Sequence, residues 1–119
     1  MSEGKWIRNI GEKTISRDVY YGPYKYLLAA AGVVVSEDDP SMIIIDANGA
    51  GRNVDMPAPS ANIEGKRWTI INQTAATHAL TVRNNGGATI QSIAATKAAE
   101  IIVLNVAGTL TWKVINVLA

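Results

Sequence analysis

Residues 65–72, GKRWTIIN, and residues 108–116, GTLTWKVIN, decide the fold of this 119-residue chain. Each segment begins with Gly, reaches a Trp, continues into β-branched aliphatic residues and ends at Asn. Because β-branched and aromatic residues favour strands, the two segments predict two β-strands of one small domain. Neither segment contains a pattern that suggests reaction chemistry.

The sequence around these two segments repeats the same alternation of strand-like runs and turn residues. After Pro40, seven short runs predict strands: 42–46, 52–56, 66–72, 80–83, 89–93, 100–106 and 109–117. Turn signals about every 8–12 residues between such runs are typical of a sandwich or a barrel. Residues 33–35 are also β-prone, whereas residues 24–31 fit either two helical turns or an extended segment. We therefore predict an all-β fold, specifically a β-sandwich.

One turn has a strong local signature. Residues 84–87 read NNGG and stand between two alternating runs. The Asn-Gly pair tolerates positive φ and is a strong hairpin signal. The pattern predicts a hairpin whose positive φ falls at Asn85 and Gly86.

Composition excludes several classes of protein. The chain has no Cys, which excludes disulfides, thiolate catalysis and Cys-based zinc sites. It shows no signal peptide and no apolar run long enough to cross a bilayer, so we expect no membrane partner and synthesis in the cytoplasm. No basic run is dense enough to indicate nucleic acid.

The net charge of +1 is unevenly distributed along the chain. Residues 1–25 carry +2, residues 26–64 carry −5 and residues 65–119 carry +4. Segments of opposite charge can attract one another between subunits. Ordinary solvated surface charge is the alternative explanation.

The last two strands are apolar on both faces. Residues 101–104 (IIVL) and 112–117 (WKVINV) lack the polar alternation of a strand with one solvated face. The excess apolar surface calls for a second cover, and another copy of the chain is the simplest one. A monomer whose own N-terminal residues fold over this face is the alternative.

The first 26 residues are predicted to form an irregular arm. They show neither a helical period nor alternation, yet they hold five of the seven aromatic residues. Aromatic and Arg side chains are enriched at protein interfaces, although these rings could instead cover the β-domain itself. The candidate contact residues are Trp6, Ile7, Arg8, Arg17, Tyr20, Tyr21, Tyr24 and Tyr26.

No catalytic or metal site is expected. Asp46 begins a segment that resembles a calcium loop, but Ala50 occupies a ligand position and Pro57 stands where a bidentate Glu is required. His78 is the only His, and no nucleophile stands at a recognisable spacing from it. We therefore expect no enzyme activity, no metal and no cofactor.

Residues 56–74, 79–84 and 108–115 together resemble small structural proteins of tailed bacteriophages. These include capsid decoration (cement) proteins and the β-domains of head and tail fibres. The similarity lies in the pattern of a Gly-Lys turn into an apolar strand ending in Asn, an LTV strand and a closing GTxxWxV. It covers roughly residues 41–119.

The resemblance implies a jelly-roll-like β-sandwich at residues 27–119, preceded by the arm at residues 1–26. It further implies a homotrimer that binds the outside of the capsid in the virion and clamps adjacent major capsid proteins, with the arm facing the capsid. Two alternatives stay open. One is a fibre module that binds a receptor or carbohydrate, and the other is a subunit of a polysaccharide-degrading enzyme.

Overall fold

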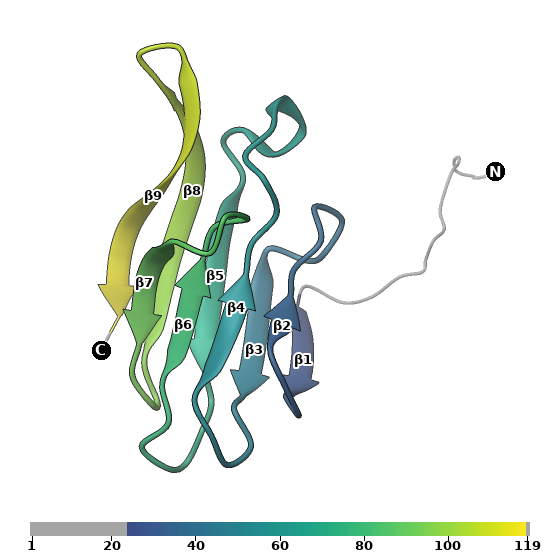
Figure 1. Ribbon diagram of the computed structural model, residues 1–119, viewed down its shortest axis with the longest axis vertical. Helices are drawn as coiled ribbons and strands as arrows, with labels where there is room; N and C mark the ends of the chain where they lie inside the picture. Colours follow the sequence, from purple (N-terminus) through teal and green to yellow (C-terminus); the bar gives the residue numbers. More distant parts are fainter. Residues whose placement is uncertain (1–23, 119) are drawn as a thin grey trace, which may run out of the picture.

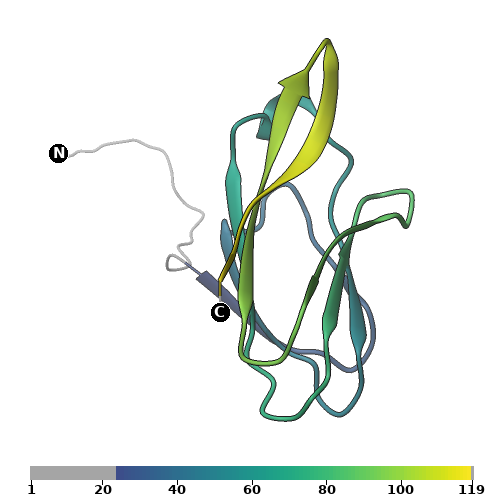
Figure 2. The same cartoon turned by 90° about the vertical axis from the view of Figure 1, so that its left-hand side faces the viewer.

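The computed structural model describes residues 24–118, which form nine β-strands in two layers and one short 3-10 helix (Figures 1 and 2). These residues contain no α-helix, and no helix among them has the length and apolarity to cross a membrane. The prediction of an all-β sandwich is confirmed. The strands are β1 (Tyr24–Leu28), β2 (Val33–Val34), β3 (Met42–Asp46), β4 (Arg52–Asp55), β5 (Arg67–Asn72), β6 (Leu80–Arg83), β7 (Thr89–Ile93), β8 (Ala98–Val106) and β9 (Thr109–Leu118), with the 3-10 helix at Ala61–Ile63.

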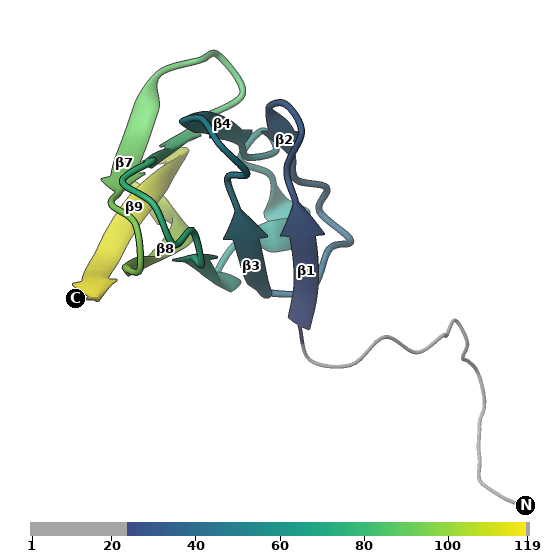
Figure 3. The same cartoon turned by 90° about the horizontal axis from the view of Figure 1, so that it is seen from below.

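The chain alternates between the two sheets from β1 to β6. The five-stranded sheet has the order β1-β3-β5-β8-β9, and the four-stranded sheet has the order β2-β4-β6-β7. Within each sheet, the strands from this first part of the chain pair in parallel. Residues 24–83 therefore wind as a flattened coil, with odd strands on one side and even strands on the other (Figure 3).

The last three strands end this coil by antiparallel pairing. β7 pairs with β6, β8 pairs with β5, and β9 pairs with β8. The β8–β9 hairpin is longer than the other strands and rises beyond the rest of the sandwich in Figure 1.

The expected jelly-roll topology is not confirmed. A jelly roll is built from antiparallel Greek keys, whereas β1, β3 and β5 are parallel neighbours. The connections 29–32, 35–41, 47–51, 56–66 and 73–79 each cross from one sheet to the other. A hydrophobic pattern reports which face of a strand is buried but not which strand lies beside it, so both topologies are consistent with the same sequence.

The core lies between the sheets and includes the two Trp residues of the repeated segments. Trp68 and Trp112 pack edge to face, with ring centroids 6.4 Å apart and an interplanar angle of 68°. Ile43 and Ile45 of β3 and Val54 of β4 are fully buried members of the same core cluster. The indole nitrogen of Trp112 donates a hydrogen bond to the carbonyl of Pro57 at 3.1 Å.

The two Asn residues that end the repeated segments have different roles. Asn72 is fully buried, and its amide nitrogen donates to the carbonyls of His78 and Ile93, each at 3.0 Å. Its Oδ1 accepts a hydrogen bond from the backbone of Thr74. Asn72 therefore fixes the corner where the chain leaves β5 for β6. Asn116, on β9, is exposed.

The predicted hairpin after β6 is present, but its positive φ is elsewhere. The φ of +89° belongs to Gly87, and neither Asn85 nor Gly86 has a positive φ. Asn84 Oδ1 accepts hydrogen bonds from the backbone nitrogens of Gly86 and Ala88. This side-chain acceptor organises a longer loop than a two-residue turn and moves the left-handed position by one residue.

Residues 24–28 are extended, which resolves the choice between helix and strand. Tyr24 and Tyr26 belong to β1, so a boundary between arm and domain at residue 26 falls inside a strand. The rest of the arm lies outside the described residues.

Candidate interaction surfaces

An unbroken apolar row crosses the outer face of the five-stranded sheet. Residues in register on neighbouring strands of this sheet share a face. One such row runs across all five strands and consists of Tyr26, Ile44, Ile71, Ala98 and Leu118. Each position on this face alternates with core positions such as Ile43 and Ile45, so the row faces away from the core.

The same face is most exposed at β1. Tyr24, Tyr26 and Leu28 keep 52%, 54% and 62% of their surface accessible. Met42 lies beside Tyr24 and is also exposed. Large apolar side chains that adjoin one another in this way usually mark a contact surface, whereas isolated ones do not.

The outer face of the four-stranded sheet is polar by comparison. Asp55, Arg83 and Thr89 are neighbours in one row, and Thr81 and Ser92 are neighbours in another. Val34 is the exposed apolar exception. The two outer faces of the sandwich therefore differ in chemistry.

The strand β9 forms one edge of the five-stranded sheet and is unusually open. All its residues from 113 to 118 are exposed, including Val114, Ile115 and Val117. Val114 and Val117 are in register with the core residues Ile101 and Ala99, so they face the inner side of the sheet, beyond the cover of the other layer. Within residues 24–118, no strand pairs with the free side of β9.

The last two strands were predicted to be apolar on both faces, and the apolar residues of the two strands differ in how far they are buried. In β8, Ile101 and Val103 are buried in the core, and Ile102 lies on the outer face, where it keeps only 9% of its surface accessible. In β9, by contrast, apolar residues are exposed on both faces.

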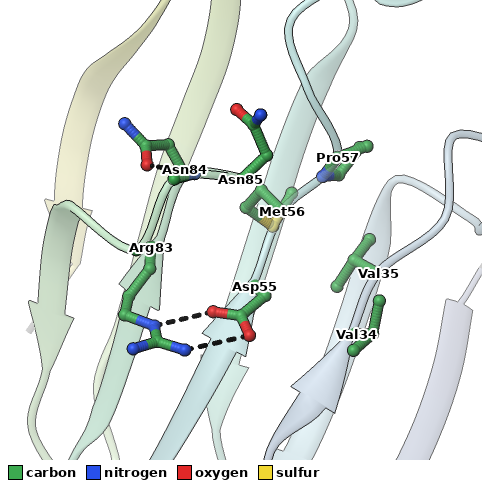
Figure 4. Close-up of a pocket in the computed structure, with 10 residues that line it drawn as sticks. Val34, Val35, Asp55, Met56, Pro57, Arg83, Asn84 and Asn85 are labelled. Carbon is green, nitrogen blue, oxygen red and sulfur yellow. Dashed lines mark hydrogen bonds and ion pairs between the residues drawn. The ribbon is translucent and has the colours of Figure 1, made fainter.

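A groove of about 470 Å³ lies beside the polar row (Figure 4). The guanidinium of Arg83 donates two hydrogen bonds to the carboxylate of Asp55, at 2.7 and 3.0 Å. The amides of Asn84 and Asn85 lie on one side of this pair, with Met56 next to them. The groove thus combines polar groups with an apolar wall that includes Val34 and Val35.

The ion pair between Asp55 and Arg83 shifts the pKa values of both side chains. The hydrogen bond from Arg83 lowers the pKa of Asp55 below its ordinary value of 3.8, although burial opposes the shift. The same hydrogen bond raises the pKa of Arg83. Both groups therefore stay charged over the whole physiological range.

The acidic turn at residues 36–39 is held against the start of β1 and β5. Lys66 Nζ donates to the carbonyls of Glu37 and Asp39 at 3.0 and 2.8 Å and lies 4.0 Å from the centroid of the Trp68 ring. Burial lowers the pKa of Lys66, while the charges of the nearby acids oppose the shift. Asp39 also forms an ion pair with Lys25 of β1 at 3.0 Å. The turn therefore places negative charge beside the first strand of the sheet.

The structure places only two of the predicted contact residues. Tyr24 and Tyr26 lie on the exposed face of β1. The other six lie outside the described residues, namely Trp6, Ile7, Arg8, Arg17, Tyr20 and Tyr21.

The segment that resembles a calcium loop is a turn between β3 and β4. Asp46 Oδ1 accepts a hydrogen bond from the backbone of Asn48, and Asn48 and Gly49 both adopt positive φ. Within residues 24–118, no three metal-ligating side chains cluster together. His78 is half-buried, and its carbonyl is bound by Asn72.

The sequence did not reveal the pairing of Asp55 with Arg83. The two residues are distant in the chain and meet because β4 and β6 are parallel neighbours in this register. Their shared outward position in two alternating strands is the signal that could have suggested it.

The chain matches no protein-family model, no curated protein and no solved structure.

Proposed function

We propose that this protein is a structural, non-catalytic module that self-associates as a homotrimer and decorates the outside of a bacteriophage capsid. The observation that carries the proposal is the apolar row across the five-stranded sheet, set against the polar outer face of the other sheet. If water covered both outer faces, both would be expected to be polar, so the apolar row on one of them indicates a contact surface.

Association through the apolar face is energetically reasonable. Full burial of an Ile, Leu or Met side chain contributes about 1.5–3 kcal/mol, and the half-exposed residues of β1 and β9 would each supply part of that amount. Several such side chains offset the cost of bringing copies together. A large aromatic such as Tyr26 is also a common anchor at an interface.

Attachment to a capsid is supported by the resemblance to decoration proteins and by the composition of residues 1–26. The proposed role of that segment is to contact the major capsid protein. Three copies on one trimer would raise the effective concentration of each contact, so weak individual contacts would give firm attachment. Binding only to the assembled shell would stabilise the shell by mass action.

Sedimentation of the purified protein and of surface variants tests self-association. We expect a trimer at micromolar concentration, and we expect Tyr26→Lys to shift it towards the monomer because a charge would be buried in the contact. Asn53→Lys, on the exposed outer face of β4, is the matched control and should remain trimeric. A monomeric parent protein would overturn the proposal.

The composition of purified particles tests attachment. We expect many copies of the chain on capsids and none on isolated tails. Copies found only on tail fibres would contradict the capsid assignment.

The groove in Figure 4 favours a second candidate function, a fibre module that binds carbohydrate. Its paired charges and two amides offer donors and acceptors of the kind that sugar hydroxyls need. A glycan array with the isolated protein tests this function. Binding that is lost in Asn85→Ala, whose side chain forms no hydrogen bond within residues 24–118, would support it.

A further inference from the structure

We propose that the copies join head to tail, with β9 of one copy pairing in parallel with β1 of the next, so that their five-stranded sheets become one continuous ring. This inference rests on the self-association proposed above and assigns the surfaces that carry it. It commits to a second copy of this chain as the occupant of both edges.

Within the described residues 24–118, both edge strands of the five-stranded sheet lack a partner on their outer side and carry apolar side chains. In Figure 1, β9 and β1 lie on opposite sides of the molecule, and both are terminal in the strand order. An edge strand presents unpaired backbone N–H and C=O groups that can pair with another strand. Here the side chains beside those groups are apolar and exposed, namely Tyr24, Tyr26 and Leu28 on one edge and Val114, Ile115 and Val117 on the other.

The direction of the strands allows the two edges to meet in a ring. β1, β3 and β5 are parallel, β8 is antiparallel to β5, and β9 is antiparallel to β8. β9 therefore runs parallel to β1. Rotation about an axis along the strands preserves strand direction, so it brings β9 of one copy beside β1 of the next as a parallel pair.

Rotation without translation also fixes which residues are level. Across the sheet, Asn116 is in the same row as Tyr24, and Leu118 is in the same row as Tyr26. The apolar row of one copy would therefore continue from Leu118 into Tyr26 of the next copy. The result is a closed apolar belt around the ring.

Charge at the two edges is complementary. Lys113 is the single charged residue of β9, and its partner Ile102 lies two positions along β8 from Glu100, the partner of Asn116. The acidic turn of residues 36–39 lies beside the start of β1, where Asp39 is held by Lys25 and Asp38 is exposed. Lys113 is in register with Ile102 and Arg67, and this row lies at the end of the sheet where Asp38 lines a hollow together with Tyr24 and Lys25. We therefore expect Lys113 of one copy to lie near Asp38 of the next. Opposite charges at such a contact favour one orientation over others.

A two-fold contact between copies would use the two edge strands and their charges less fully than a head-to-tail contact. Pairing of β9 with β9 of another copy would be an isologous contact. It would leave β1 without a partner from the second copy, and it would not use the opposite charges of Lys113 and the acidic turn. The head-to-tail contact covers both edges and closes when the rotation completes a ring.

Engineered cysteines test the contact directly, because the natural chain has none. Cα atoms of neighbouring strands lie within the range that a disulfide needs. The double variant Tyr24→Cys/Asn116→Cys, oxidised as the full chain, should give covalently linked trimers on a non-reducing denaturing gel. Each single variant should remain a single chain. A covalent dimer from either single variant would show an isologous contact and would overturn the inference.

Charge reversal provides a second test by sedimentation. Lys113→Glu and Asp38→Lys should each weaken association by about tenfold or more, since each places like charges together. The double variant should recover the parent affinity. Lys97→Glu reverses an exposed charge in the loop before β8 and is the matched control.

The outcomes separate this inference from the proposed function. A monomeric parent protein overturns both. A trimer that forms no intersubunit disulfide in the double cysteine variant, or that does not recover on double charge reversal, retains self-association and overturns the head-to-tail pairing.

Discussion

Asp55 and Arg83 show how two residues acquire a shared property that neither has alone. They meet through a bidentate contact on the polar sheet, and this contact lowers the pKa of the carboxyl group. Neither residue is deeply buried, so the pair is solvated and its effect on stability depends on pH rather than on packing.

The pH dependence of unfolding should report this pair. Because the pKa of Asp55 in the folded protein is lower than its ordinary value of 3.8, the pair stabilises the fold above that value. The stabilisation is lost as the pH falls through the lowered pKa. Denaturant unfolding at a series of pH values should show the parent losing its advantage over Asp55→Asn in the acidic range. A constant difference between the two proteins at all pH values would contradict the assignment.

At the scale of elements, the sequence was informative about strands and uninformative about their partners. The runs at 42–46, 80–83 and 89–93 coincide with β3, β6 and β7, and the other four predicted strands agree with the structure to within two residues at each end. Alternation and turn residues are local properties, so one sequence can reveal them. Parallel neighbours are separated by a whole turn of the coil, for example Tyr24 and Met42, and no local pattern specifies that distance.

The candidate surfaces were predictable to the same extent. The apolar excess of the last strands was visible in the sequence, and it led to the expectation of a second copy. The row that includes Ile44 and Ile71 was not visible, because it depends on the register between β3 and β5. The groove around Asp55 was hidden for the same reason.

The loop after β6 offers a test at the scale of an element. Gly87→Ala should destabilise the protein by about 1 kcal/mol, because an L-residue is strained at its φ of +89°. Gly86→Ala is the matched control, since the φ of Gly86 is not positive and an added Cβ would lie 3.4 Å from the nearest atom, Asn84 Oδ1. Thermal unfolding of the two variants provides the comparison. Equal midpoints, or a lower one for Gly86→Ala, would contradict this description of the loop.

At the scale of the whole molecule, the main feature is the difference between its faces. One outer face is polar and carries the groove, while the other carries the apolar row and, within residues 24–118, ends in two edge strands that have no partner on their outer side. A division of roles follows naturally under the proposed function. The sheets would hold the trimer together, and residues 1–26 would make the contact with the capsid.

Removal of the N-terminal residues tests this division. Because β1 begins at Tyr24, the shortened chain should begin at Gly22, so that the strand is retained. We expect it to fold and to form trimers but to lose attachment to capsids, as measured by co-sedimentation with undecorated particles. If it fails to fold, the aromatic residues of this segment belong to the core. If it binds capsids as well as the full chain, the loops around Asn48 and Asn84 become the candidate docking surface.

The winding of the chain also has a consequence for the order of folding. The β8–β9 hairpin joins residues that are close in sequence, such as Val106 and Thr109, and hairpins of this kind form within about 1–10 μs. Each parallel pair must instead close a whole turn of the coil, as between Arg52 and Leu80, and such closures are slower. β5 joins the coil to β8. We therefore expect the C-terminal hairpin to act as the template on which the earlier strands assemble. During synthesis, β1 to β6 would leave the ribosome before the hairpin, and they would remain unpaired until the last part of the chain had been made.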